Sequence, residues 1–190
     1  MLLFYLWFFP AVWAAYLVYW QIAAAGAKPT QRLESAASRI TRAIFFLAAI
    51  ALLCLPYIPI PWLYRHFPAP ALAAFWIGAA ITVAGMFFAI WARRHIGSNW
   101  SRSVTIKQNH ELITSGPYAF VRHPIYTGLL FAFLGTAIAT TQVRGLLAFA
   151  LVFIPLWYKL RLEEKWMRTQ FGETYVAYSR RVAALVPFLL

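Results

Sequence analysis

The residues best suited to chemistry gather in one polar block between positions 93 and 126. Within it, the stretch GPYAFVRHPIYTG places Arg122, His123 and Pro124 directly before an apolar run. Proline fits the first turn of a helix, where its missing N–H leaves no bond unmade. The free N–H groups at such a helix start, together with the positive end of the helix dipole, attract anions and hydrogen-bond acceptors. The pattern predicts a ligand site here, with a purely structural helix cap as the alternative.

A pair of acids, Glu163 and Glu164, follows the last apolar run of the chain. A carboxylate beside hydrocarbon is costly, so both are functional candidates. The competing interpretation is a salt bridge to a basic residue of the same helix: Lys159, Arg161 or Arg168.

The residue types that are absent or rare exclude several chemistries. The chain has no aspartate and only five glutamates, so hydrolysis by two carboxylates and acid-rich magnesium sites are not expected. Its four histidines include no pair one helical turn apart, and Cys54 is the only cysteine, so we expect no metal site. No two glycines are spaced as Gly-x-Gly, which argues against a dinucleotide fingerprint and a Walker loop.

The composition is that of an integral membrane protein, with 63% hydrophobic and 12% charged residues. A bilayer crossing needs roughly 17 to 25 apolar residues. The candidate runs are 2–22, 43–60, 71–92, 126–142 and 145–158. The last two are short and indicate a tight helical hairpin, which we expect to cross. We therefore expect an all-α integral membrane fold with about five transmembrane helices. The first run lacks a basic start and a small-residue cleavage site, so we expect it to be retained.

Basic residues alternate from one connection to the next. Fifteen of the 17 lysines and arginines lie after the first, third and fifth runs, and two lie in the other connections. Positive charge marks the cytoplasmic side, which predicts an N-terminus outside and a C-terminus and active site in the cytoplasm. The net charge of +12 would also favour anionic lipid headgroups, although topology alone explains most of these charges. We expect membrane lipids as partners and no nucleic acid.

The chain lacks repeats and long linkers, so we expect one membrane domain over residues 1–190. Its connections predict an amphipathic helix from Thr30 onward, a proline-rich loop at 57–70, and a short hairpin that pairs 103–106 with 111–113. Beyond Tyr158, aromatic residues recur at spacings of three to five among arginines, which predicts a C-terminal amphipathic helix.

A combination of motifs carries a family resemblance. Gly116-Pro-Tyr-x4-Arg-His-Pro-x-Tyr-x-Gly is preceded by Asn-His110-Glu-Leu-Ile and followed by Glu163-Glu164-x6-Phe171-Gly172-Glu-x-Tyr175-x2-Tyr178. Together these motifs resemble the isoprenylcysteine carboxyl methyltransferase family and the wider set of membrane methyltransferases that includes phospholipid N-methyltransferases. The resemblance covers about half of the chain, residues 94–187. It implies three N-terminal spans over 1–92 and a methyltransferase core over 93–190.

The resemblance also implies a cofactor, S-adenosyl-L-methionine, and a lipid or lipidated substrate that enters from the bilayer. The implied cofactor-binding residues are His110, Glu111, Leu112, Ile113, Tyr118, Arg122, His123, Pro124, Ile125, Tyr126, Glu163 and Glu164. Glu163 would meet the cofactor's ammonium group, whereas Lys159, Arg161 and Tyr126 would serve the methyl acceptor. The family usually has arginine where this chain has Lys159, and lysine cannot make the bidentate fork that suits a carboxylate.

Methyl transfer agrees with the residues themselves. A carboxylate acceptor is already ionised at neutral pH and needs no general base, which suits a chain poor in histidine and acid. We therefore expect carboxyl O-methylation of an isoprenylcysteine-like substrate. The alternatives are phospholipid or small-amphiphile N- or S-methylation, a membrane reductase that uses NADPH, and a non-enzymatic membrane scaffold.

Overall fold

The computed structural model describes residues 2–24, 30–55, 57–100, 105–107 and 111–187. Its long helices are α1 (Leu2–Ala23), α2 (Ala36–Cys54), α3 (Ala71–Ile96), α4 (Pro124–Thr140) and α5 (Val143–Arg181). Three short 3-10 helices, η2 (Pro61–Tyr64), η3 (Gly97–Asn99) and η4 (Gly116–Ala119), lie in the connections, as do two short strands, β1 (Thr30–Leu33) and β2 (Thr105–Lys107).

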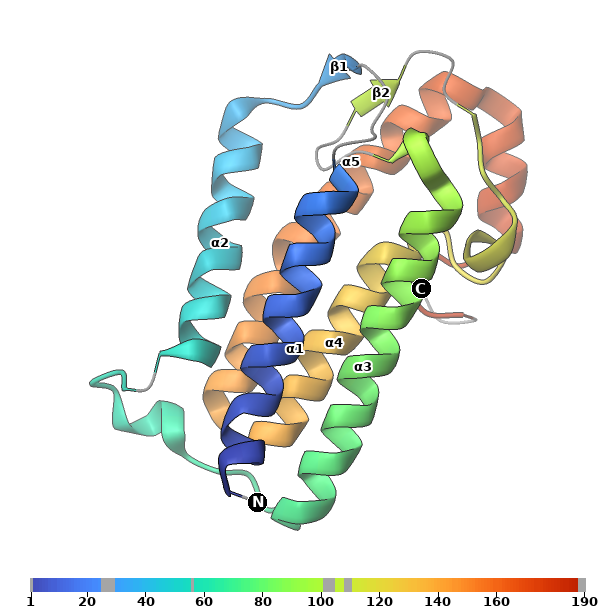
Figure 1. Ribbon diagram of the computed structural model, residues 1–190. Helices are drawn as coiled ribbons and strands as arrows, with labels where there is room; N and C mark the ends of the chain where they lie inside the picture. Colours follow the sequence, from blue (N-terminus) through green and yellow to red (C-terminus); the bar gives the residue numbers. More distant parts are fainter. Residues whose placement is uncertain (1, 25–29, 56, 101–104, 108–110, 188–190) are drawn as a thin grey trace.

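The five long helices form one bundle (Figure 1). The two strands and the bend of α5 lie at one end of it, and the loop between α2 and α3 lies at the other. Aromatic and apolar side chains remain exposed along the helices, including Trp7, Ile44, Leu72 and Phe87. Such surfaces are tolerated because lipid, rather than water, surrounds a membrane helix.

Helix length and composition agree with a membrane protein. Among the described residues, three helices are long and apolar enough to cross a bilayer, at Ala36–Leu53, Ala71–Asn99 and Val143–Arg181. Helix α4 is apolar but shorter, with 17 residues. The chain is therefore a helical integral membrane protein, as expected.

Helices α3 and α4 make the closest helix contact of the bundle. Gly85 of α3 lies against the backbone of Gly128 of α4, and a Cβ added at Gly85 would come 2.5 Å from the Gly128 carbonyl oxygen. Gly78 and Gly135 repeat the arrangement two helical turns away, where an added Cβ would come 2.4 Å from the Gly135 oxygen. Small residues at such positions let two membrane helices approach to backbone contact. This contact fixes the start of α4, which carries the predicted site.

The strand pairing differs from the predicted hairpin. Strand β2 pairs antiparallel with β1, from Thr30 opposite Lys107 to Leu33 opposite Thr105. Residues 111–113 have no regular secondary structure. The helix predicted from Thr30 onward is present but its predicted start is wrong, because β1 occupies residues 30–33 and α2 begins only at Ala36, after a Ser35 cap. The pairing ties the connection before α2 to the polar block.

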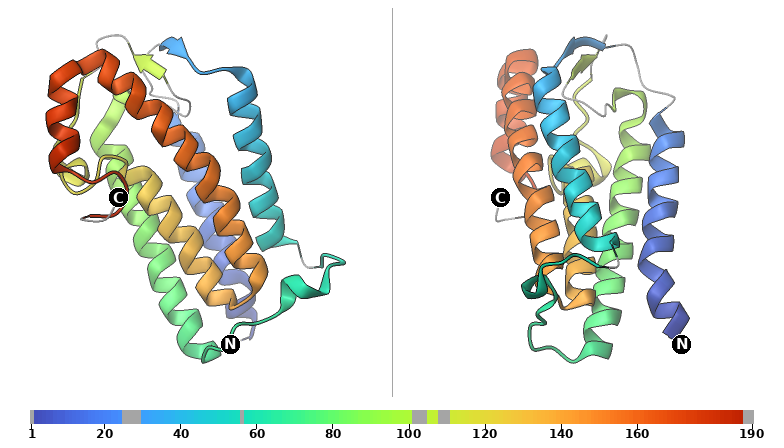
Figure 2. Two further views of the ribbon diagram at one scale, coloured as in Figure 1. Left: turned by 180° about the vertical axis from the view of Figure 1, so that it is seen from behind. Right: turned by 90° about the vertical axis from the view of Figure 1, so that its left-hand side faces the viewer.

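The predicted C-terminal amphipathic helix is continuous with the last apolar run. Helix α5 extends for 39 residues and bends at Gly172, whose backbone is in a left-handed conformation (φ 52°). Glycine adopts this conformation without the steric cost that other residues incur. After the bend, the helix turns back toward η4 (Figures 1 and 2). The residues after α5 then lie against the loop that precedes α4: Val121 forms an isolated bridge with Ala183.

Candidate active site

The loop before α4 has a fixed backbone. Gly116 has a φ of 59°, and a Cβ added there would come within 2.9 Å of three atoms of the His95 ring. The next residues form η4, and the loop end is held by two backbone bonds from the N–H groups of Arg122 and His123 to the carbonyls of Ala183 and Ala184 (2.8 and 3.0 Å). The hydroxyl of Tyr178 adds a bond of 2.6 Å to the Tyr118 carbonyl.

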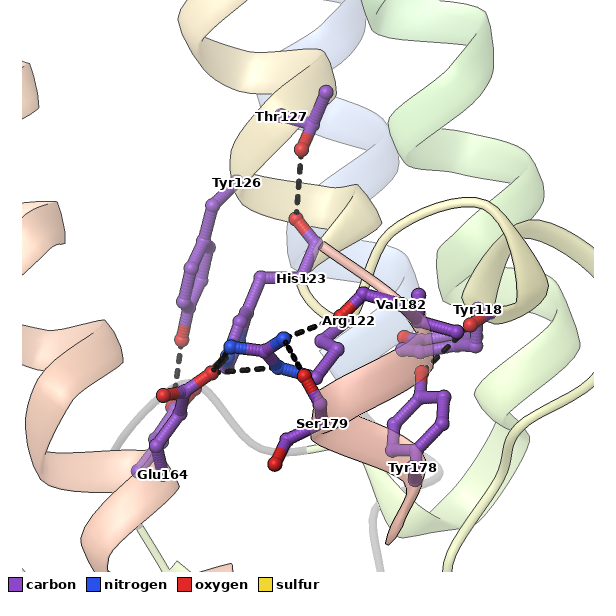
Figure 3. Close-up of polar contacts among 10 residues, drawn as sticks. Tyr118, Arg122, His123, Tyr126, Thr127, Glu164, Tyr178, Ser179 and Val182 are labelled. Atoms are coloured by element: carbon purple, nitrogen blue, oxygen red, sulfur yellow. Dashed lines mark hydrogen bonds and ion pairs between the residues drawn. The ribbon is translucent and has the colours of Figure 1, made fainter. Parts of the chain in front are cut away.

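His123 is the last residue before α4, and Pro124 occupies the first helical position, as the sequence predicts. The carbonyl of His123 accepts the first α4 hydrogen bond, from the Thr127 N–H (3.0 Å). The Thr127 hydroxyl donates to the same carbonyl and to that of Leu185 (3.2 and 2.7 Å). The helix start is therefore fixed both within the loop and by the C-terminal segment (Figure 3).

Glu163 stands at the centre of a buried polar cluster. The Tyr126 hydroxyl donates to its Oε1 over 2.6 Å. Lys159 Nζ lies 3.7 Å from the same oxygen and 5.0 Å from the centre of the Tyr126 ring. His123 Nδ1 lies 3.5 Å from the other carboxylate oxygen. The cluster brings together α4, α5 and the loop.

Glu164 is held from across the chain rather than from its own helix. Arg122 Nε donates to its Oε1 over 2.7 Å, and Arg122 Nη2 donates to the same oxygen. Arg122 Nη1 reaches the carbonyls of Ser179 (3.0 Å) and Val182. The predicted salt bridge of Glu164 to a basic residue of its own helix is thus replaced by an ion pair with Arg122 (Figure 3).

His123 lies between the two acids. Its Nε2 is 3.5 Å from Glu164 Oε1, and it is buried without a hydrogen-bond partner among the described residues. Burial opposes a charge on the ring, but the carboxylates of Glu163 and Glu164 outweigh it, so the pKa of His123 is raised. His123 and Tyr126 also stack, with ring centres 5.4 Å apart and planes 5° from parallel.

A pocket of about 140 Å³ opens beside this cluster. Ten of the predicted cofactor residues line it: Glu111, Leu112, Ile113, Tyr118, Arg122, His123, Pro124, Ile125, Tyr126 and Glu163. His110 was also predicted but lies outside the described residues. Glu164 stands behind Arg122 and is absent from the described lining.

The three residues predicted to serve the acceptor lie in different places. Tyr126 lines the pocket. Lys159 is buried next to Glu163, outside the pocket lining. Arg161 is exposed, with its guanidinium 5.9 Å from the centre of the Trp157 ring. The structure therefore brings Lys159 and Tyr126 together and leaves Arg161 apart.

Six further residues line the pocket without having been predicted: Ile96, Asn99, Trp100, Met167, Tyr175 and Tyr178. Trp100 is held by Arg93, whose guanidinium carbon lies 4.5 Å from its ring centre. Tyr175 and Tyr178 belong to the aromatic recurrence that predicted the C-terminal helix. The bend at Gly172 brings that helix to the pocket, and no local pattern in the sequence reveals this.

The sequence of this chain is similar to those of known methyltransferases. The family model for phospholipid methyltransferases matches residues 73–174, more than half of the chain. The chain belongs to this family. It is 32% identical over 96 residues to protein-S-isoprenylcysteine O-methyltransferase B of Arabidopsis thaliana, with 49% of each protein covered. It is also 32% identical over 120 residues to the cobalt-zinc-cadmium resistance protein CzcN of Cupriavidus metallidurans, with 60% of this chain and 52% of that protein covered.

The fold is shared with a methyltransferase of known structure. The structure of a eukaryotic intramembrane Ras methyltransferase, isoprenylcysteine carboxyl methyltransferase, matches 80% of this chain and 52% of that one, with a TM-score of 0.52 and 24% identity. The chain spans about half the length of the curated relatives it matches. The family and the fold are thereby established.

Proposed function

We propose that this protein transfers a methyl group from S-adenosyl-L-methionine to the carboxylate of an isoprenylcysteine-like acceptor in the membrane. The observation that carries the proposal is the contact between the pocket and the buried cluster of Tyr126, Lys159 and Glu163. The relatives named as isoprenylcysteine O-methyltransferases support the choice of acceptor.

The pocket has the groups that this cofactor would need. Glu163 offers a carboxylate for the cofactor's ammonium group, and the buried Nε2 of His123 is a polar atom with no described hydrogen-bond partner. Leu112, Ile113 and Ile125 add an apolar wall against which the adenine or the ribose of the cofactor would lie. When bound, S-adenosyl-L-methionine supplies an electrophilic methyl group: as the acceptor oxygen bonds to the methyl carbon, the carbon–sulfur bond breaks and its electron pair stays on sulfur.

The residues of the chain would orient the two partners and exclude water. Tyr126 lines the pocket and the Lys159 ammonium group lies 5.0 Å from the centre of its ring, so an anionic acceptor beside Tyr126 would lie near a fixed cation. Low polarity there favours a transfer in which the opposite charges of acceptor and donor are neutralised. Orientation of two reactants contributes roughly 7 to 11 kcal/mol in well-aligned cases.

The proposal includes an orientation in the membrane. The polar end of the bundle, with the pocket, would face the cytoplasm. The chain would cross the membrane five times, with its N-terminus outside. Labelling of single cysteines placed in the α2–α3 loop and in the α5 bend, with a membrane-impermeant reagent on intact cells, tests this arrangement.

Two observations bear on the alternatives. The description of the matching family names phospholipids. Lys159 also stands where the isoprenylcysteine carboxyl methyltransferases that the sequence resembles usually have arginine, so N-methylation of an amphiphile is the second candidate. A phosphorylated dinucleotide such as NADPH would need several basic ligands. In the described lining, the one arginine, Arg122, is already paired with Glu164.

One experiment separates these functions. The purified protein is incubated with methyl-labelled S-adenosyl-L-methionine and membrane lipid extract, and the labelled product is treated with alkali. Label lost in alkali identifies an ester, as proposed. Label that survives identifies an amine or thioether product, and the absence of labelled product contradicts methyl transfer.

A further inference from the structure

A further buried ion pair joins Glu34, just before α2, to Arg42 of α2, outside the residues matched by the family model. Arg42 Nη1 donates to Glu34 Oε2 over 2.6 Å, and Arg42 Nη2 donates to Glu34 Oε1. Ser38 joins the pair: its hydroxyl donates to Glu34 over 2.7 Å and accepts from Arg42 Nη1 over 3.1 Å. The Glu34 side chain is fully buried and that of Arg42 is 15% exposed. A buried ion pair is weak evidence for stability alone, so its presence invites a functional account.

The pair lies close to the proposed acceptor side of the site. Helix α2 packs along α5, which carries Lys159. Phe46, one helical turn after Arg42, packs against the same hydrophobic cluster as Tyr126, and that cluster contains Leu160, the neighbour of Lys159. Arg42 and Lys159 are thus cations on two helices that pack against each other.

Arg42 retains donors for a further ligand. A guanidinium group has five N–H donors in a rigid plane. Three of those of Arg42 are used, two by Glu34 and one by Ser38, and no other partner occurs among the described residues. The Nε–H and one Nη2–H remain, and they form a parallel pair along one edge of the plane. Such a pair matches the two oxygens of a carboxylate.

This free edge of the Arg42 guanidinium can make the bidentate contact to a carboxylate that Lys159 cannot make. Lysine presents a compact point charge, whereas arginine makes the planar fork that recognises a carboxylate. Within each of the two pairs the charges balance, since Glu34 offsets Arg42 and Glu163 offsets Lys159. An acceptor carboxylate would add one negative charge, which the net positive charge of the methyl-donating cofactor would offset.

We propose that Arg42 is the second cation of the acceptor subsite and binds the acceptor's carboxylate together with Lys159. Glu34 is the positioning residue that holds Arg42 in place. The inference rests on the proposed function and names the residue that gives the reaction its preference for a carboxylate over an amine or an uncharged headgroup.

The test measures binding rather than turnover. The probes are an S-farnesylcysteine derivative with a free carboxylate and the same compound as its carboxamide, titrated calorimetrically into the full-length protein in detergent. The wild-type protein is expected to bind the carboxylate at least about tenfold more tightly, and Arg42→Gln is expected to reduce that preference to about twofold. Arg42→Lys retains the charge without the fork and should give an intermediate preference. Arg39→Gln, an exposed arginine of the same helix, is the matched control and should behave as wild type.

A charge swap separates recognition from structure. The double variant Glu34→Arg with Arg42→Glu restores an ion pair at the same place but removes the cation from position 42. If Arg42 binds the acceptor, the swap recovers thermal stability lost in Arg42→Gln without recovering the preference for the carboxylate. If the swap recovers both, Arg42 only holds the structure together and the proposal is wrong.

The result is distinguishable from a failure of the proposed function. An Arg42-dependent preference for the carboxylate, without any methyl transfer, supports the subsite and contradicts the reaction. Ester formation with an unchanged KM in Arg42→Gln supports the reaction and overturns the role of Arg42. A wild-type protein that binds both probes equally also overturns it.

Discussion

The guanidinium of Arg122 holds the carboxylate of Glu164, which lies 42 residues further along the chain. The same guanidinium also bonds to the carbonyls of Ser179 and Val182. One side chain therefore joins the loop before α4, the middle of α5 and the segment that follows α5. Because residues of the loop and of α5 line the pocket, Arg122 acts as its frame rather than as a free ligand for a cofactor.

Replacing Arg122 should therefore destabilise the protein. Arg122→Gln leaves the buried Glu164 carboxylate without its cation, which costs about 3 to 5 kcal/mol of the free energy of unfolding. Denaturant unfolding in detergent measures the loss. Arg168→Gln, which removes an exposed arginine of α5, is the control and should cost under about 1 kcal/mol. Equal losses in the two variants would show that the ion pair contributes nothing.

The partner of Glu164 illustrates what the sequence could not reveal. Spacing along a helix favours partners three or four residues away, and basic residues occur near Glu164 on its own helix. The actual partner, Arg122, is brought in by the fold of the loop. For Glu163 the helical rule is correct, since Lys159 lies 3.7 Å away at the i,i+4 position. Helical spacing thus accounts for one of the two ion pairs and not for the other.

Removing the charge of Glu163 should weaken cofactor binding. Glu163→Gln keeps the shape of the side chain but loses the attraction for the cofactor's ammonium group, so the dissociation constant of S-adenosyl-L-methionine should rise at least about tenfold. Calorimetric titration in detergent measures it. Glu173→Gln, at an exposed acid beyond the bend, is the matched control. An unchanged affinity in Glu163→Gln would remove this residue from the site.

Lys159 should affect the acceptor more than the cofactor. In Lys159→Ala, Glu163 still accepts a hydrogen bond from Tyr126 and faces His123, so it stays in place. We expect the acceptor KM to rise about tenfold or more while cofactor affinity changes less than about threefold. Steady-state kinetics and calorimetry give the two values. Equal losses in both would show that Lys159 acts through Glu163.

The helices themselves could largely be predicted, for a physical reason. Hydrocarbon forces each spanning segment to satisfy its own backbone, so a long apolar run has few structures open to it. The run 71–92 became α3, Ala71–Ile96, and the run 126–142 became α4, Pro124–Thr140. Strand β2 is only three residues long and its partner lies more than 70 residues earlier, so neither periodicity nor turn chemistry could select it. The bend at Gly172 was equally hidden, because glycine permits a left-handed backbone without requiring one.

The close approach of α3 and α4 should be intolerant of larger side chains. Gly85→Leu would drive its Cβ into the Gly128 carbonyl, 2.5 Å away, and would separate the helices. Overpacking typically costs about 1 to 3 kcal/mol, and contact with backbone rather than with a flexible side chain places this variant at the upper end. Thermal unfolding in detergent measures it. Ala80→Leu, on an exposed face of α3, should leave the midpoint within a few degrees, and similar midpoints for the two variants would contradict the packing argument.

The pH dependence of stability should reveal His123. Its pKa is raised above the ordinary value of about 6.5 because Glu163 and Glu164 outweigh the effect of burial. The folded state therefore binds the proton more tightly than the unfolded state. The resulting stabilisation is fully present below about pH 6.5 and is lost as pH rises through the raised pKa of the folded protein. Stability in detergent should fall between about pH 6 and pH 9 in the wild-type protein, and His123→Asn should flatten that fall. His66→Asn, at an exposed histidine at the far end of the bundle, is the control. An unaltered pH profile in His123→Asn would mean that His123 is neutral between its two acids.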